Sequence, residues 1–252
     1  MRCRCVALLL LLAGMAGRAE TVLMAGTEWP PYMGAALPRQ GAATAVVTAA
    51  FKAMDIDIRY DFLPWQRTVQ DGTSNPKYAG YMPAYYSQSR AFNGYISDKI
   101  AASRVWFAEQ RAKPVVWSTA RLLPSTRVGL VQGYVNTPEF DRRTIDRKFT
   151  TDMAVSDENN LTKLAANRID LALIDLYVFN YYLTYSSAPG VNAKLLKFQG
   201  DILDEKPVYI FFQKTPQGLR LRNLFNQGIA KINAQKIFDD TMAEMSPSSF
   251  AP

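Results

Sequence analysis

Two successive runs of strand-like and helix-like segments limit this chain to a small set of folds. The first run covers residues 21–108 and includes an amphipathic helix at 41–54 and, at 56–62, a strand whose apolar and charged side chains alternate. A second run, 126–205, opens with a strand that enters a glycine turn at 126–134. This alternation indicates an α/β protein with mostly parallel strands, and the two runs predict two sheets.

The remaining expected elements follow the same period. In chain order they are a strand at 21–25, a helix at 65–72 ended by Gly72, a strand from 78 to Pro83, a strand at 102–109, a helix at 138–149, a helix at 156–169 with Ser156 as N-cap, a strand at 170–176, a helix at 177–186, a strand at 206–214, and helices at 218–233 and 234–245. The tail after them is expected to be loose.

Residues 1–19 have the layout of a secretory signal peptide. A basic start, MRCRC, precedes the apolar run VALLLLLAGMA, and small residues surround the expected cut after Ala19. The apolar run is too short to span a bilayer. Cys3 and Cys5 both precede the cut and do not follow the apolar run, where a lipid-anchoring cysteine is found. We therefore expect a soluble periplasmic protein without a lipid anchor.

The composition excludes several classes of function. The chain has no histidine, the commonest general base and metal ligand, and no cysteine after the expected cut. Zinc sites and Ser-His or Cys-His nucleophile systems are therefore excluded, and we expect no metal and no cofactor. The net charge of +7 falls to +4 when the three arginines of residues 1–19 are removed. Because the other basic residues are scattered among acids, we expect no nucleic-acid partner.

Two tryptophans are held by prolines where strands end. Residues 26–34 read GTEWPPYMG, so two prolines separate Trp29 from Tyr32, and LPWQR places Trp65 after another strand. Proline restricts the backbone, so an aromatic ring held beside it can stack on a ligand at little ordering cost. Alternatively, Trp29 and Tyr32 close the sheet edge, and Trp65 is a core residue at a helix start. Both interpretations stay open on the residues alone.

Three further features suggest contacts to a charged ligand. Arg90, in YYSQSR, carries a planar fork of donors suited to a carboxylate, although most lone arginines are solvated. Asp175 ends an apolar strand and either meets an ammonium or caps the next helix. The turn at Gly133 and Tyr134 offers backbone N–H groups to an anion.

Taken in order, these segments resemble the family 3 extracellular solute-binding proteins, the receptors of polar amino-acid uptake systems. The resemblance covers essentially the whole chain after residue 19. The segments that carry it are TEWPPY (27–32), PWQR (64–67), SQSR (87–90) with FNGYISDK (92–99), RVGLVQGY (127–134), RIDLALID (168–175) and FFQKTPQGLRLRNLFNQGIAKI (211–232).

The resemblance implies a two-lobed periplasmic-binding-protein-like (type II) fold with two chain crossings. The first lobe would be 20–108 plus 207–252 and the second 109–206, closing on a ligand like a hinge. It also implies a role for each candidate side chain. Arg90 would hold the ligand's carboxylate, Asp175 its ammonium, and Trp29 and Trp65 its side chain, while the Gly133–Tyr134 turn would add backbone donors.

The chain departs from the family pattern just before the arginine. Amino-acid receptors place small Ser or Thr hydroxyls there, whereas this chain has Met82, Pro83, Ala84 and the bulky Tyr85. Tyr134 also replaces a usual Thr or Ser. Fewer carboxylate donors and more aromatic surface favour a larger, flatter or less polar solute that still has an anionic group.

These features lead to three functional hypotheses. The first is a monomeric periplasmic receptor, not an enzyme, that delivers a small anionic or zwitterionic solute to the permease of a membrane ABC transporter. The second is a sensing module that docks on a membrane sensor. The third is a cyclic-acid dehydratase-like enzyme, for which Glu28 is the candidate acid.

Overall fold

The computed structural model describes residues 20–115, 125–136, 140, 149–200 and 204–245. The predicted signal peptide, all of the expected helix over 138–149 except Phe140 and Phe149, and the tail after Met245 lie outside these residues. Within the described ranges, no helix combines the length and apolar character needed to cross a membrane.

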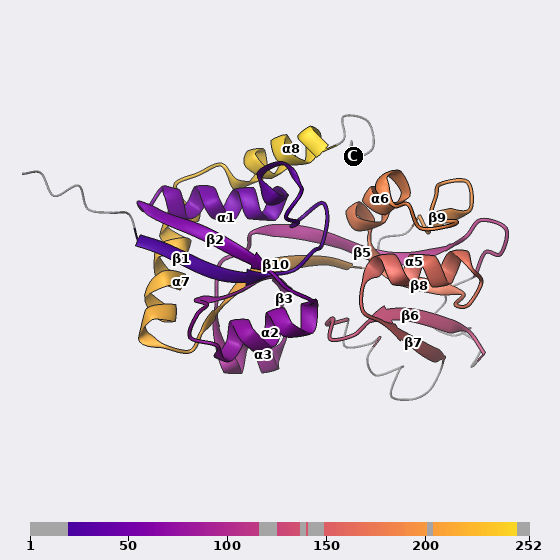
Figure 1. Ribbon diagram of the computed structural model, residues 1–252, viewed down its shortest axis with the longest axis horizontal. Coiled ribbons are helices and arrows are strands. Elements are labelled where there is room, and N and C mark those ends of the chain that lie inside the picture. Colours follow the sequence, from indigo (N-terminus) through magenta and orange to yellow (C-terminus); the bar gives the residue numbers. More distant parts are fainter. Residues whose placement is uncertain (1–19, 116–124, 137–139, 141–148, 201–203, 246–252) are drawn as a thin grey trace, which may run out of the picture.

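The described chain forms two α/β lobes joined by two long strands (Figure 1). The joining strands are β5 (Ala101–Gln110) and β10 (Asp204–Gln213). The first lobe contains β1 (Glu20–Gly26), β2 (Ile56–Phe62), β3 (Gly80–Tyr85), β4 (Gly94–Ile96), a 3-10 turn (Pro38–Gln40), α1 (Ala42–Lys52), α2 (Trp65–Ser74), α3 (Gln88–Asn93), α7 (Pro216–Ile229) and α8 (Ala234–Met245). The second lobe contains β6 (Arg127–Val131), β7 (Thr150–Ala154), β8 (Leu171–Asp175), β9 (Leu196–Phe198), α5 (Asp157–Ala165) and α6 (Leu176–Tyr185).

Hydrogen bonding joins the strands of both lobes, so the expectation of two separate sheets is wrong. The order among the described strands is β2-β1-β3-β10-β5-β8-β6-β7, with β4 beside β10 and β9 beside β5. Each lobe has a parallel core, β2-β1-β3 in the first and β8-β6-β7 in the second. The two cores meet through β10 and β5, which pair antiparallel with each other at 204–208 and 101–105. The sheet is continuous because β5 and β10 run from one lobe to the other and pair with each other.

Both predicted lobe boundaries fall inside or beside this antiparallel pair. The break at 108/109 lies in β5, and the break at 206/207 lies in β10. The division into 20–108 plus 207–252 and 109–206 stays a prediction.

The first lobe has a core on each face of its sheet, as the alternation of side chains in β10 requires. Phe212 packs with Phe51 of α1 and Phe225 of α7 on one face. Its neighbour Phe211 stacks on Tyr81 on the other face, where α2 lies. A two-sided core of this kind confirms an α/β layered fold rather than a one-sided sheet.

Two local expectations need correction. The helix that starts at Trp65 continues past Gly72 to Ser74. A Cβ on Gly72 would lie 2.4 Å from the Cβ of Tyr81, so glycine serves close helix–strand packing there and does not end the helix. The strand over 80–85 continues through Pro83 because the register of β10 shifts between Tyr209 and Phe211, opposite the proline.

Candidate functional site

All eight candidate residues lie where the two lobes face each other. Those of the first lobe lie at or soon after the carboxyl ends of strands β1, β2 and β3. Those of the second lobe lie just after β6 or at the end of β8. Their positions are Trp29 and Tyr32 after β1, Trp65 at the start of α2, Tyr85 at the end of β3, Arg90 in α3, Gly133 and Tyr134 after β6, and Asp175 at the end of β8. The strands β1 and β8 belong to the parallel cores of different lobes, and the carboxyl end of each faces the other lobe, which is why residues 29 and 175 line the same cavity.

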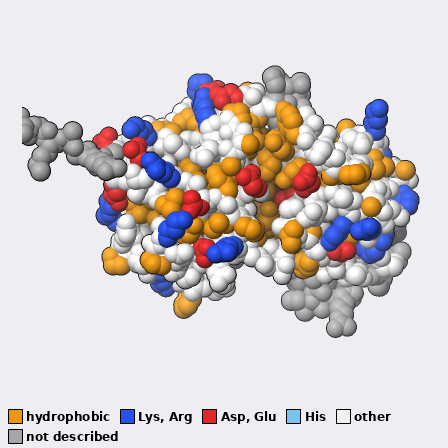
Figure 2. Space-filling model, viewed as in Figure 1, with side chains coloured by type: hydrophobic (Ala, Val, Ile, Leu, Met, Phe, Trp, Pro, Cys, Tyr) orange, Lys and Arg blue, Asp and Glu red, His pale blue; other side chains and the backbone are white. Residues whose placement is uncertain are grey.

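Two adjoining cavities lie between the lobes, where hydrophobic side chains gather in the space-filling view (Figure 2). Both are lined by Trp29, Tyr85, Tyr134 and Val135. The cavity that includes Arg90 has a volume of about 20 Å³, and its neighbour has about 30 Å³. These volumes admit roughly one or two water molecules each. A solute larger than that needs the walls to move apart.

Arg90 reaches across the interface from the first lobe to the second. Its guanidinium donates to the carbonyl of Tyr85 at 2.8 Å and to the carbonyl of Gly133 at 3.1 Å, and it lies 5.2 Å from the centre of the Trp65 ring. Burial lowers the pKa of Arg90 from its usual value. Among the described residues it has no carboxylate partner. A desolvated guanidinium paired only with carbonyls and a ring is suited to an incoming anion.

Trp65 supplies a second donor on the same side. Its side chain is 7% exposed, lines the cavity with Arg90, and packs edge-on against Tyr134 with the ring centres 5.7 Å apart. The indole Nε1–H is buried and has no hydrogen-bond acceptor in the described structure. An orphaned buried donor carries a free-energy cost that an acceptor brought by a ligand would remove.

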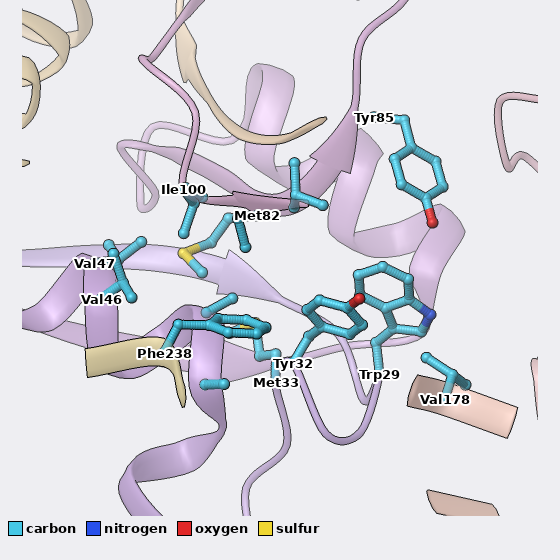
Figure 3. Close-up of a cluster of buried hydrophobic side chains, with 14 of the residues drawn as sticks. Trp29, Tyr32, Met33, Val46, Val47, Met82, Tyr85, Ile100, Val178 and Phe238 are labelled. Carbon is cyan, nitrogen blue, oxygen red and sulfur yellow. The ribbon is translucent and has the colours of Figure 1, made fainter. Parts of the chain in front are cut away.

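Trp29 and Tyr32 occupy different positions relative to the cavities, so the two interpretations that the sequence left open, a ligand-stacking ring and a ring that closes the sheet edge, do not apply to them equally. Their rings stack with centres 4.3 Å apart, and Tyr85 meets Trp29 edge-on (Figure 3). Trp29 lines both cavities. Tyr32 is fully buried between Trp29 and Phe238 and lines neither described cavity. Tyr32 therefore closes the sheet edge, and Trp29 forms the wall in front of it.

Asp175 caps a helix and is fully occupied by donors. One oxygen, Oδ1, accepts from the backbone N–H groups of Tyr177 and Val178 at 2.7 and 2.9 Å. The other, Oδ2, accepts from the Tyr32 hydroxyl at 2.9 Å, the Ser103 hydroxyl at 2.6 Å and the Arg104 N–H at 2.9 Å. Burial raises its pKa, against the effect of these bonds. The helix-capping alternative is the one that the structure supports, whereas the ammonium contact stays a prediction.

The Gly133–Tyr134 turn also differs from what the resemblance implies. Gly133 adopts φ +80°, a conformation that favours glycine. However, the Tyr134 N–H donates to the Val131 carbonyl at 3.1 Å and closes the turn. The Gly133 carbonyl points the other way and accepts from Arg90. In this conformation the Tyr134 amide is occupied, so this turn offers an anion fewer donors than expected.

Asp157 is a site residue that the sequence reasoning did not select. In the sequence it stands only as the residue after the expected N-cap Ser156, yet it lines the larger cavity and is 4% exposed. The Tyr134 hydroxyl donates to its Oδ2 at 3.1 Å. Burial raises the pKa of Asp157 to about 7, opposed by the Tyr134 bond and assisted by the nearby Asp175. Its place three residues after the end of β7 was the available signal.

Glu28, the acid of the enzyme hypothesis, lies apart from the cavities. Its side chain is exposed and accepts from the backbone N–H of Ala35 at 3.0 Å. It lines neither of the two cavities described above. The structure thus offers no buried carboxyl at this position for proton transfer.

Replacing Tyr32 by Phe tests the contact between Tyr32 and Asp175. We expect the free energy of unfolding to fall by about 1–3 kcal/mol, because a buried hydrogen bond to a carboxylate is lost while the ring packing remains. Urea unfolding of both proteins measures the difference. An unchanged or increased stability would show that this bond contributes nothing.

The architecture is that of two-lobed, periplasmic-binding-protein-like domains, and solved structures confirm this fold. A histidine kinase sensor domain with similarity to periplasmic binding proteins matches with a TM-score of 0.75 at 13% identity, covering 93% of this chain and 99% of that one. The GluR0 ligand-binding core from Nostoc punctiforme, in complex with L-glutamate, matches with a TM-score of 0.70 at 15% identity, covering 92% of this chain and 100% of that one. A candidate ABC-transporter binding component from Wolinella succinogenes, complexed with lysine, matches with a TM-score of 0.69 at 13% identity, covering 89% of this chain and 94% of that one.

Comparison by sequence gives no match for this chain. No family model matches it, and no curated protein matches its sequence. The resemblance to solute-binding proteins is therefore confirmed at the level of the fold.

Proposed function

We propose that this protein is a periplasmic solute-binding module that holds a small organic solute with an anionic group between its two lobes. The observation that carries the proposal is Arg90. Its guanidinium is partly buried, lies against Trp65, and has no carboxylate partner among the described residues. The unpaired Nε1–H of Trp65 lines the same cavity and adds a second donor.

Side chains of both lobes would surround the solute. Trp29, Trp65, Tyr85 and Arg90 come from the first lobe, and Tyr134 comes from the second. The strands β5 and β10 are the two connections about which the lobes, 20–108 plus 207–252 and 109–206, would open and close. Opening breaks the hydrogen bond between Arg90 and Gly133, and the freed guanidinium then pairs with the solute.

As a transport receptor, the module would act as a monomer and deliver its solute to the permease of a membrane ABC transporter. The likeness to a candidate ABC-transporter component supports this role. The likeness to a histidine kinase sensor domain supports sensing through a membrane partner as a second candidate. The exposed position of Glu28 favours neither a dehydratase nor another acid-catalysed reaction.

A thermal-shift screen tests the proposal. The purified protein is heated with amino acids, other small carboxylates, sugars and cyclic acids in turn. A ligand at 100 times its dissociation constant stabilises the folded state by about 2.7 kcal/mol. For a chain of this size that corresponds to a rise in Tm of roughly 5–10 °C. We expect the response among carboxylates. A response to neutral sugars alone, or to nothing, would contradict an anion site at Arg90.

A further inference from the structure

The larger cavity contains a buried carboxylate without a counter-charge. Asp157 is 4% exposed, and no lysine or arginine of the described chain lies within ion-pair distance of it. Its neighbours are neutral groups: the Tyr134 hydroxyl donates to it, and the Trp29 side chain lies close enough to lower its pKa. Burying a carboxylate in this way is unfavourable unless a cation joins it.

The other charged groups of the same cavity are engaged elsewhere. Five donors surround the two oxygens of Asp175, so that carboxylate has little capacity for another partner. Lys206 donates to the Val135 carbonyl, and its Nζ lies 4.4 Å from the centre of the Tyr85 ring. Asp157 is thus the acid of this cavity that is best suited to receive a cation.

Asp157 and Arg90 lie at opposite ends of one aromatic-lined slot. Of these two cavities, Arg90 lines the smaller and Asp157 the larger, while Trp29, Tyr85 and Tyr134 line both. Arg90 contacts the backbone at Gly133, next to Tyr134, and Asp157 contacts the hydroxyl at the far end of the Tyr134 side chain. The side chain of Tyr134 therefore lies between the contact that Arg90 makes and the contact that Asp157 makes.

We propose that Asp157 binds the cationic group of the solute, and that the solute is a zwitterion whose ammonium and carboxylate are separated by a short carbon chain. The inference rests on the proposed function, because Arg90 must hold the carboxylate end. The aromatic faces of Trp29, Tyr85 and Tyr134 then cover the chain and attract the cation as it approaches Asp157. An α-amino acid, with both charges on one carbon, cannot reach both ends of the slot.

Isothermal titration calorimetry with four matched sets of probes tests the inference. The sets are ω-amino carboxylates of four to six carbons, the parent carboxylates, the α-amino isomers and the corresponding dicarboxylates. The titrations are made at about pH 8, where Asp157 is ionised. We expect one ω-amino carboxylate to bind at least tenfold more tightly than its parent and its α-isomer, the usual size of a charge-assisted contact.

Two neutralised variants show which acid is responsible. Asp157→Asn should remove the preference for the ω-ammonium, so that an ω-amino carboxylate binds no more tightly than its parent carboxylate. Glu158→Gln, the matched control, changes the next residue of the same helix, which lines neither cavity, and should keep the preference. A preference that persists in Asp157→Asn, or tightest binding of an α-isomer or a dicarboxylate, would overturn the inference.

The parent carboxylates separate this inference from the proposed function. If they bind in a manner lost in Arg90→Ala but the ω-ammonium adds nothing, the proposed function stands and the cation site is wrong. If no probe of any set binds to the unmodified protein, both proposals are wrong.

Discussion

Replacing Arg90 by alanine is expected to lower the affinity for a carboxylate ligand by about 100-fold or more. Among the described residues that line the smaller cavity, Arg90 is the only cation, and a bidentate charge-assisted pair is among the strongest polar contacts in a protein site. The free energy of unfolding should change by no more than about 1 kcal/mol, because the two hydrogen bonds to carbonyls are offset by the cost of desolvating the side chain. Calorimetric titration and urea unfolding measure the two effects separately.

Arg90→Lys is the matched control for this experiment. Lysine keeps the positive charge but lacks the planar fork, so we expect an affinity between those of the unmodified protein and of Arg90→Ala. Equal affinities in all three proteins would place the ligand elsewhere.

Replacing Asp157 by asparagine is expected to raise the free energy of unfolding by about 4 kcal/mol at pH 8 and by little at pH 4. Folding raises the pKa of this carboxyl from 3.8 to about 7, and each pKa unit corresponds to about 1.36 kcal/mol. The folded state binds the proton more tightly than the unfolded state does. Stability from this group is therefore complete below pH 4 and is lost as the pH rises to 7. Asparagine avoids that loss and still accepts from Tyr134.

Urea unfolding between pH 4 and pH 8 measures this effect. The groups that face Asp157 are Asp175, Tyr134 and Tyr182, together with Lys206 in the same cavity. The tyrosines remain neutral over this range because burial raises their pKa values. Glu158→Gln serves as the control, with no comparable gain expected at pH 8. If the free energy of unfolding of Asp157→Asn rises by the same amount at every pH, or falls, Asp157 is not held in an unfavourable ionised state.

Much of the fold could be predicted from local pattern. The half-buried strand β2 appears in the sequence as alternating apolar and charged residues, and the N-cap of α5 appears as Ser156, whose hydroxyl accepts from the Asn159 N–H. The continuation of α2 past Gly72 could not be predicted. Gly72 suggested a helix end, but glycine is needed there because Tyr81 of β3 approaches so closely that a Cβ has no room.

For the candidate site, the aromatic side chains could be predicted from the sequence and the roles of the acids could not. Its aromatic side chains could be selected because proline beside Trp29 and Trp65 is visible in the chain, and both line the cavity between the lobes. The acids could not be assigned in advance. Asp175 and Asp157 both lie where a strand leads into a helix, and nothing in the sequence shows how many donors each one meets.

The sequence by itself determined most of the strands and helices, although not α3, β4, β7 or β9, and it determined which strand ends carry large aromatic residues. Periodicity and proline act over a few neighbouring residues, which is why they can be read from the chain. Only the tertiary structure decided that one sheet continues through both lobes, that Asp175 is enclosed by Tyr32, Ser103 and the start of α6, and that Asp157 faces the cavity. The reason is that the satisfaction of a buried charge depends on side chains far apart in the chain, which only packing brings together.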